Sequence, residues 1–393
     1  GERVLVLAPA VPAKGYRTYP IGEAPSDAAT AVMAQAEADG WTVSTTRLEN
    51  RFFRIELDAA GQFASVWDKR AQREVLKAGQ KGNVLTAFED RPMNYSNWDI
   101  DMYYTEKSWP VDGLESIEVV ERGPVRGTLR LRRRFGETVL DQDIHLYRDI
   151  ARVDFETHVD WQMSQVLLKV AFPVEINADK ATYEIQFGHV ERPTHWNTSW
   201  DWARFEVCGH RWADLSEAGY GVSLLNDCKY GHDIKDGVMR LTLIKSGIEP
   251  NPVTDRGEHV FTYSFFPHAD SWREAGTLPM AARLNVPLKG LVSAPRTGCG
   301  ADGNAMSFVA CDARNVLVET VKQAEDGDGV IVRLYESENR RGPASLRFGR
   351  PLARVHATSL MEVNEGEIAF VGDTLPVRLK PLEIQTFRVH FAD

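Results

Sequence analysis

The chain has 393 residues, 43% of them hydrophobic and 26% charged, with a formal net charge of −10 at pH 7. This composition is typical of a globular protein with two or three domains, and the negative charge argues against nucleic acid or an anionic membrane surface as a partner. No apolar run approaches the roughly 18 residues that a membrane-spanning helix needs, so no membrane partner is predicted.

Residues 1–50 are interpreted as an N-terminal linker that contains one strand. Within it, residues 4–7 predict the strand and residues 27–39 predict a short helix. Ser26 is placed to cap that helix, and Gly40 is placed to end it.

From residue 51 the hydrophobic pattern changes to a period of two, which is the period of a strand with one buried face. Residues 53–57 alternate in this way, Ala60-Gly61 follows as a turn, and residues 63–67 return, so a hairpin is predicted. The same reasoning predicts strands over residues 129–132, 153–161, 182–187, 222–225, 239–244 and 260–266.

The stretch from Leu284 to Asp302 is rich in Gly, Pro and small residues, which predicts a domain boundary. We therefore expect a large unit over residues 51–288 and a small terminal unit over residues 289–393. Strands of the small unit are predicted over residues 316–321, 330–335, 353–360 and 382–391. The predicted fold class is all-β, with a large antiparallel β-sandwich followed by a small β-sandwich.

Metal sites and disulfides are not indicated by the sequence. The four cysteines, Cys208, Cys228, Cys299 and Cys311, show no CxxC spacing, which favours reduced thiols and a cytoplasmic location. His158 and Asp160 share a strand face, but no HExxH or paired HxH motif accompanies them. The EDGDG string at residues 325–329 lacks the spaced oxygen ligands of a calcium loop and is interpreted as a hairpin turn.

The stretch from residue 186 to 231 carries four of the ten tryptophans and three of the ten histidines. Aromatic faces beside short polar side chains suit a sugar, although composition alone favours a tryptophan-rich core seam. Within this stretch His195, Asn197, Trp200 and Asp201 lie within seven residues. They are too close to belong to separate strands, so a connecting loop is predicted, where binding groups often gather.

Two further stretches carry candidate residues. Asp99 and Asp101 would project to one side of an extended chain, but such neighbours cannot flank a glycosidic bond from two sides. A hydroxyl-binding role for Trp98 and Asp99 is retained. Lys229 could either pair with Asp227 to pin a loop or reach a ligand, and both readings stay open.

At these residues the sequence closely resembles a known family. The strings FGHVERPTHWNTSWDWARFEV, HRWADLSE, YGVSLLNDCKYG and DRGEHVFTYSFFPH are similar to the C-terminal half of the family-38 glycoside hydrolases, the α-mannosidases. The resemblance is nearest to the bacterial and cytosolic-vacuolar branch, and it runs from about Leu48 to Phe391.

The resemblance implies a parent enzyme that is retaining and zinc-dependent and that cleaves terminal α-linked mannose. Its zinc and its aspartate nucleophile would belong to an N-terminal β/α barrel, which a helical bundle follows. Neither the zinc-binding motif nor the segment of the nucleophile is found in this sequence. This chain is therefore expected to hold no catalytic residue, no cofactor and no metal, and to be inactive alone. The implied partners are the missing barrel and bundle and mannose-containing glycans, within a parent that is a homo-oligomer.

The resemblance also implies a galactose mutarotase-like supersandwich for the large unit, with loops that help to shape the sugar pocket. By motif match, these positions are Trp98, Asp99, Asp101, Asn226, Asp227, Lys229 and Tyr230. The loop from His195 to Asp201, with Asn197 and Trp200, is a secondary candidate, with a structural role as its alternative. An autonomous carbohydrate-binding module is the alternative, which an exposed tryptophan platform would favour. An aldose epimerase-like activity ranks last, because fold does not carry function.

Overall fold

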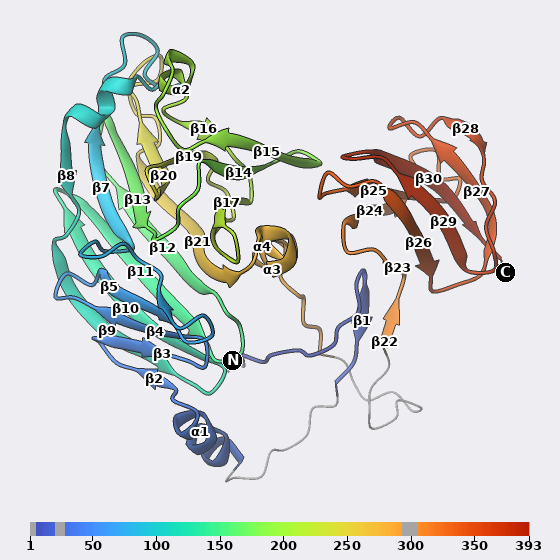
Figure 1. The fold of residues 1–393 in the computed structure, drawn as a ribbon, viewed down its shortest axis with the longest axis horizontal. Coiled ribbons are helices and arrows are strands. Elements are labelled where there is room, and N and C mark those ends of the chain that lie inside the picture. Colours follow the sequence, from blue (N-terminus) through green and yellow to red (C-terminus); the bar gives the residue numbers. More distant parts are fainter. Residues whose placement is uncertain (1–4, 20–27, 293–304, 393) are drawn as a thin grey trace. The chain divides into compact units, whose positions relative to one another are not determined.

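The computed structural model describes residues 5–19, 28–292 and 305–392, which form two compact units. The larger unit comprises Ala24–Glu184 and Val190–Lys289, and the smaller comprises Gly1–Glu23, Ile185–His189 and Gly290–Asp393. Figure 1 shows that both units are built mainly of strands. The helices of the described segments are all too short or too polar to cross a membrane.

The larger unit contains three sheets, and every strand pairing resolved within them is antiparallel. In spatial order, the nine-stranded sheet consists of β15 (Gly188–Pro193), β14 (Lys180–Ile185), β17 (Trp212–Glu217), β18 (Tyr220–Asn226), β21 (Gly257–Ala269), β12 (Val153–Trp161), β11 (Thr138–Tyr147), β10 (Arg126–Phe135) and β9 (Leu114–Arg122). The six-stranded sheet consists of β16 (Val207–Cys208), β19 (Gly231–Lys235), β20 (Val238–Ser246), β13 (Val166–Pro173), β7 (Val84–Glu89) and β8 (Ser108–Pro110). The five-stranded sheet consists of β2 (Thr42–Val43), β3 (Arg47–Glu49), β4 (Phe53–Leu57), β5 (Phe63–Asp68) and β6 (Arg73–Glu74).

A single hydrophobic core fills the space between the sheets. Phe155 of the nine-stranded sheet lies 5.7 Å from Phe172 of the six-stranded sheet, measured between ring centroids. Phe155 also stacks on Tyr263 at 4.8 Å, and Phe172 stacks on Phe265 at 4.6 Å. Phe155, which the period-two pattern placed inside, therefore meets Phe172 of the facing sheet across a sandwich, as sheet packing requires.

Few helices accompany the sheets of the larger unit, and these are α1 (Ala28–Ala38), α2 (Ser199–Ala203), α3 (Trp272–Ala275), α4 (Thr277–Asn285) and the 3-10 turn η1 (Met102–Glu106). The pair α3 and α4 was not predicted from the sequence. It covers the nine-stranded sheet through a small cluster that includes Trp212, Trp272 and Ala281. Gly276 joins the two helices at φ = 75°, a left-handed conformation that glycine adopts without strain.

The smaller unit has its own core between two sheets. Its five-stranded sheet consists of β24 (Val316–Gln323), β25 (Val330–Glu336), β30 (Ile384–Phe391), β27 (Leu352–Thr358) and β28 (Asn364–Glu367). A three-stranded sheet consists of β23 (Val309–Cys311), β26 (Gly342–Phe348) and β29 (Thr374–Leu379), and β1 (Gly15–Arg17) pairs with β22 (Ala305–Ser307). The predicted all-β fold class is confirmed.

The N-terminal predictions need correction. Residues 5–7 form no strand, and Val4 and Ser26 lie outside the described residues. The helix is present over Ala28–Ala38 and is followed by Gly40 at φ = 86°. Residues 42–49, expected to be linker, form β2 and β3 instead, because Leu48 is an apolar residue whose burial in the main core extends the sheet.

Candidate functional site: two loops over the six-stranded sheet

Two loops cover the face of the six-stranded sheet that points away from the core. The first, residues 90–107, contains η1, and the second, residues 194–206, contains α2, which Figure 1 shows at one end of the larger unit. The ring of Tyr104 in the first loop lies 5.2 Å from Phe88 of β7 and 6.4 Å from Phe205 of the second loop. The loops that carry Trp98 and Trp200 are therefore packed on one sheet face.

A buried ionic group, the Lys169 cluster, fastens both loops to that sheet. Lys169 Nζ donates to Asp233 Oδ2 at 2.8 Å and to Glu206 Oε2 at 2.5 Å. Tyr104 Oη donates to Asp233 Oδ2 at 3.2 Å, and Arg240 Nη1 donates to Asp233 Oδ1 at 2.8 Å. The side chains of Lys169 and Asp233 are only 1% and 3% exposed, so these two charges depend on their partners.

The electrostatics of the Lys169 cluster fix its protonation at neutral pH. Burial disfavours the Lys169 ammonium, but the carboxylates of Asp233 and Glu206 outweigh it and raise the pKa of Lys169. Burial likewise disfavours the Asp233 carboxylate, yet the cations of Lys169 and Arg240 lower the pKa of Asp233. Burial raises the pKa of Tyr104 to about 12. Lys169 and Asp233 therefore keep their charges near pH 7, Tyr104 stays neutral, and the cluster orients the loops.

The first loop is also tied to the segment after β20. Ser96 Oγ accepts from the backbone N–H groups of Ile248 and Glu249 at 2.8 and 3.1 Å. Lys245 Nζ donates to the Ser96 carbonyl at 2.6 Å and forms an ion pair with Asp90. These bonds hold the chain in a turn before η1, where an extended stretch was expected.

Within that turn the predicted residues have different surroundings. Trp98 is 69% exposed, and its ring lies 5.6 Å from the ring of Tyr95. Asp99 is exposed, whereas Asp101 Oδ2 accepts the backbone N–H of Met93 at 2.8 Å. Asp101 thus closes a turn, which agrees with the structural alternative considered for it, and only Trp98 and Asp99 face solvent freely.

In the second loop, Asp201 is part of a capping box at the start of α2. Its Oδ2 accepts from Thr198 N at 3.0 Å and from Thr198 Oγ1 at 2.9 Å, while Thr198 Oγ1 accepts from Asp201 N. His195 Nδ1 lies 3.5 Å from the same carboxylate and accepts from Asn197 N at 3.4 Å. Trp200 projects from this helix and is 74% exposed.

Asn226 is the last residue of β18, and Asp227 to Tyr230 form a third loop that follows it. Asn226 is buried; its Nδ2 donates to the His210 carbonyl at 2.8 Å and its Oδ1 accepts from Lys229 N at 2.7 Å. Asp227 Oδ2 accepts from Thr262 N at 3.0 Å. Tyr230 is half exposed, beside His210.

The pairing of Asp227 with Lys229, one of the two alternatives, does not form among the described residues. Lys229 Nζ lies instead 4.5 Å from the centroid of the Phe261 ring, and burial lowers its pKa. Asp227 faces the neighbouring strand β21, because the register of β18 against β21 brings Thr262 next to it. The third loop is thus held by hydrogen bonds between the side chains of Asn226 and Asp227 and backbone groups.

Sequence reasoning missed the Lys169 cluster, although one signal was present. Lys169 interrupts an otherwise apolar run, VLLKVAFP, and a buried lysine requires a carboxylate partner. The partners Glu206 and Asp233 could not be identified, since they come from other elements of the chain.

The described residues contain no group of three or more His, Cys, Asp or Glu side chains that could hold a metal ion. A catalytic zinc site needs three protein ligands and an open position. The donor set in the described parts of this chain therefore does not fit a zinc ion.

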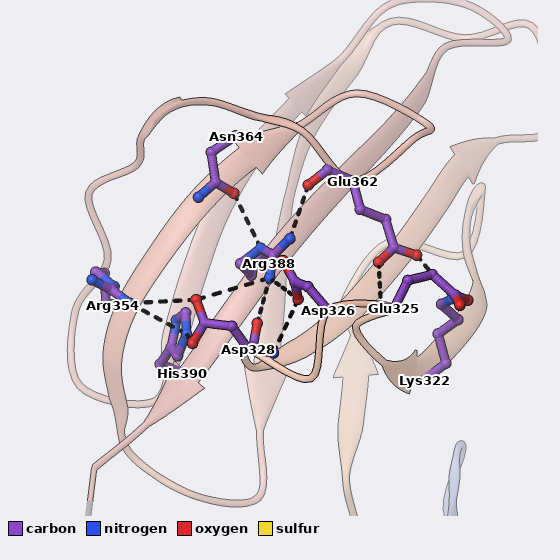
Figure 2. Close-up of polar contacts among 9 residues, drawn as sticks. All are labelled: Lys322, Glu325, Asp326, Asp328, Arg354, Glu362, Asn364, Arg388 and His390. Atoms are coloured by element: carbon purple, nitrogen blue, oxygen red, sulfur yellow. Dashed lines mark hydrogen bonds and ion pairs between the residues drawn. The ribbon is translucent and has the colours of Figure 1, made fainter.

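The smaller unit has an extensive polar cluster, the Arg388 cluster, shown in Figure 2. Arg388 is 4% exposed, and its guanidinium donates to Asp326 Oδ1 at 2.7 Å, to the Asp328 carbonyl at 2.6 Å and to the Glu362 carbonyl at 2.9 Å. Its Nε donates to Asn364 Oδ1 at 3.1 Å. The EDGDG string is the turn between β24 and β25, as predicted, and its acids are already paired with cations.

Two families of known domains match the chain. Residues 48–253 match the glycosyl hydrolases family 38 C-terminal domain, and residues 315–387 match the glycosyl hydrolases family 38 C-terminal beta sandwich domain. Alpha-mannosidase G of Dictyostelium discoideum is 37% identical over 355 residues, which are 87% of this chain and 32% of that protein. Alpha-mannosidase 2C1 of Homo sapiens is 35% identical over 383 residues, which are 95% of this chain and 36% of that protein.

The chain thus spans about a third of the length of these curated relatives. Among solved structures, an alpha-mannosidase from Enterococcus faecalis V583 is similar with a TM-score of 0.71 and 16% identity, over 88% of this chain and 42% of that one. At this level of identity the likeness shows a shared fold.

Proposed function

Because the chain belongs to the glycosyl hydrolases of family 38, as its motifs predicted, we propose that it is the C-terminal β-region of an α-mannosidase that hydrolyses terminal α-linked mannose. The observation that carries this proposal is the 35–37% identity to named α-mannosidases over 87–95% of the chain. The parent enzyme is proposed to act on mannose-containing glycans in the cytoplasm as a homo-oligomer.

The remainder of the enzyme is proposed to supply the chemistry. Retaining hydrolysis requires a nucleophile and a general acid about 5 Å apart. On the two loops, Asp101 and Asp201 accept hydrogen bonds that hold turns, and Glu206 and Asp233 neutralise Lys169. A bound zinc ion would supply Lewis-acid stabilisation of the substrate, and its ligands are proposed to lie in the N-terminal barrel.

This chain is proposed to complete the sugar pocket from one side. The loops of residues 90–107 and 194–206 are fastened by the buried Lys169 cluster, while Trp98 and Trp200 remain exposed on them. A rigid base that presents exposed aromatic rings suits contact with a sugar face or with another protein domain. Tyr230, on the third loop, is a further exposed ring available for the same contact.

The test is reconstitution with an aryl α-mannoside. The purified chain alone should give no turnover, and addition of the N-terminal part of the parent enzyme, expressed as a separate polypeptide, should restore it. Trp98→Ala should raise KM in the reconstituted enzyme more than it lowers kcat, while Trp109→Ala, a less exposed ring on the edge strand β8, serves as the matched control. Turnover by the chain alone that survives Asp99→Asn and Asp227→Asn would overturn the assignment of catalysis to the missing part.

An autonomous carbohydrate-binding module is the second candidate, and the exposure of Trp98 and Trp200 favours it. Isothermal titration of the chain with mannose and short α-mannobiosides distinguishes the two. Saturable heat that disappears in Trp98→Ala or Trp200→Ala would support an independent sugar site. No heat up to millimolar sugar would mean that these rings require the barrel to form a pocket.

A further inference from the structure

A small pocket in the larger unit has three cationic side chains among its lining residues. It lies between β15, β19 and the residues around α2, and its lining includes Tyr183, Arg192, Arg204, Val207, Asp233 and Lys235. The volume open to the centre of a water-sized sphere is about 10 Å³. That is room for one water-sized species, and too little for a phosphate or a sugar.

Two of the three cations lack an anionic partner. Arg192 lies over the Tyr183 ring at 4.7 Å, and its Nη1 is buried with no hydrogen-bond acceptor. Lys235 is only 7% exposed, and its Nζ donates to the carbonyls of Pro193 and His195 at 3.0 and 3.3 Å. Carbonyl oxygens solvate an ammonium group but do not cancel its charge.

The third cation and the acid of the pocket do not restore neutrality. Arg204 reaches Asp201 only at 4.0 Å, and the nearer bonds of that carboxylate go to Thr198. Asp233 is already shared between Lys169 and Arg240. The pocket is therefore positive within a chain whose net charge is −10.

The pKa shifts of half-buried Arg192 and buried Lys235 agree with this geometry. Burial lowers the pKa of Arg192 and of Lys235. The carboxylates of Asp201 and Asp233 act against burial at Lys235 but do not outweigh it, and the Arg204 charge adds to the lowering at both residues. A buried cation with an adequate anionic partner shows the opposite shift, as Lys169 does.

We propose that this pocket binds one monatomic anion of chloride size, held by Arg192, Arg204 and Lys235. A water molecule would fill the space but leave Arg192 and Lys235 without an anionic partner. Arg204 and the His195 carbonyl belong to the loop of residues 194–206, whereas Lys235 belongs to β19. The bound anion fastens that loop to the sheet and so orders the exposed Trp200. This inference stands whether or not the α-mannosidase proposal holds.

The test follows thermal unfolding of the whole chain by tryptophan fluorescence, with sodium chloride or bromide replacing sodium gluconate at constant ionic strength. Binding to the folded state should give a saturable rise of about 2–4 °C in the unfolding midpoint. Arg192→Met should abolish the rise, while Arg130→Met, which removes an exposed arginine paired with Asp143, should keep it. Hydrogen exchange in residues 194–206 should slow on chloride addition in the wild-type chain.

Anomalous scattering from a bromide-soaked crystal gives a second readout that needs no variant. A bromide peak within contact distance of Arg192 Nη1 and Lys235 Nζ supports the site even if Arg192→Met fails to fold. An unsaturable rise that persists in Arg192→Met, or saturation without a peak in the pocket, would overturn the proposal. A peak without any saturable effect would mean an adventitious ion only and would likewise count against it.

Discussion

The Lys169 cluster of the larger unit and the Arg388 cluster of the smaller unit solve the same problem in different ways. Each places a buried cation where loops must be held against a sheet. In the Lys169 cluster the carboxylate of Asp233 is as buried as the cation, whereas in the Arg388 cluster Asp326 is 59% exposed. The charges of Lys169 and Asp233 are therefore stabilised by their protein partners, whereas Asp326 of the second cluster is also hydrated.

This difference determines how each cluster should respond to mutation, pH and salt. Removing the cation from a buried cluster leaves buried carboxylates that water cannot reach, which costs free energy of folding. Exposed carboxylates are hydrated again at little cost when their cation is removed. The chain allows the two units to be followed separately, because all ten tryptophans lie between Trp41 and Trp272, in the larger unit.

The largest effect is expected from Lys169→Met. It leaves Asp233 and Glu206 buried without their shared cation, and it should destabilise the larger unit by about 3–5 kcal/mol. Urea unfolding followed by tryptophan fluorescence measures this, with Lys180→Met as the control, because that lysine is exposed and pairs with an exposed Glu191. A loss of folding free energy below about 1 kcal/mol would show that the cluster behaves as a solvent-exposed ion pair.

Arg388→Met should have a smaller effect, confined to the smaller unit. The variant loses hydrogen bonds to Asp326 in the turn between β24 and β25, to the Glu362 carbonyl and to Asn364 at the start of β28. Asp326 can return to water, so a loss of about 2 kcal/mol is expected. Far-UV circular dichroism should show an earlier transition with unchanged tryptophan fluorescence. Arg347→Met, at an exposed pair with Asp373, is the control; an equal loss there would contradict the comparison.

His232 should make the larger unit sensitive to mild acid. Its ring is fully buried without a hydrogen-bond partner, and burial followed by the Lys169 charge lowers its pKa to about 3. The unfolded chain binds this proton near pH 6.5 and the folded chain does not, so stability falls as pH drops from about 6.5 toward 3.

His232→Phe should weaken that dependence, so the urea midpoint should differ less between pH 7.5 and pH 5 than in the wild-type chain. His158→Phe changes an exposed histidine and should leave the dependence intact. An identical decline in the wild type and in His232→Phe would show that another group is responsible.

The smallest effect is expected at Asp326. The Arg388 hydrogen bond and a backbone hydrogen bond lower the pKa of Asp326 to about 2. A depressed carboxyl pKa stabilises the fold above the unfolded value near 4, and that stability is lost as pH falls through about 2. Asp326→Asn should flatten the acid transition of the smaller unit by circular dichroism and should lose its effect in 1 M salt, since Asp326 is exposed. Destabilisation that does not change with salt would show that the Asp326–Arg388 pair behaves as a buried ion pair, like that of Lys169 and Asp233.

Much of the fold was predictable because alternation of side chains is a local signal. The pattern of residues 53–57 and 63–67 gave β4 and β5, whose pairing joins Leu57 to Phe63. The helices α3 and α4 were missed, because their sequence leads into a Gly- and Pro-rich stretch that was interpreted as a boundary.

The candidate site was less predictable, because it depends on pairings between distant segments. Trp98 and Trp200 could be selected as exposed rings on loops, but nothing local indicated that Tyr104 and Phe205 would bring the two loops together. Lys229 was expected either to pair with Asp227 or to reach a ligand. The strand register instead places Asp227 where it accepts a hydrogen bond from Thr262 N, and Lys229 Nζ lies over the Phe261 ring.

The pairing of β1 with β22 has a consequence for synthesis on the ribosome. Gly15 is the register partner of Ser307, so a strand made early must wait for about 290 further residues before its neighbour exists. At the roughly 5–20 residues per second of translation, that wait is on the order of 15–60 seconds. During this interval the larger unit can fold, while the early strand stays unpaired until its distant neighbour emerges.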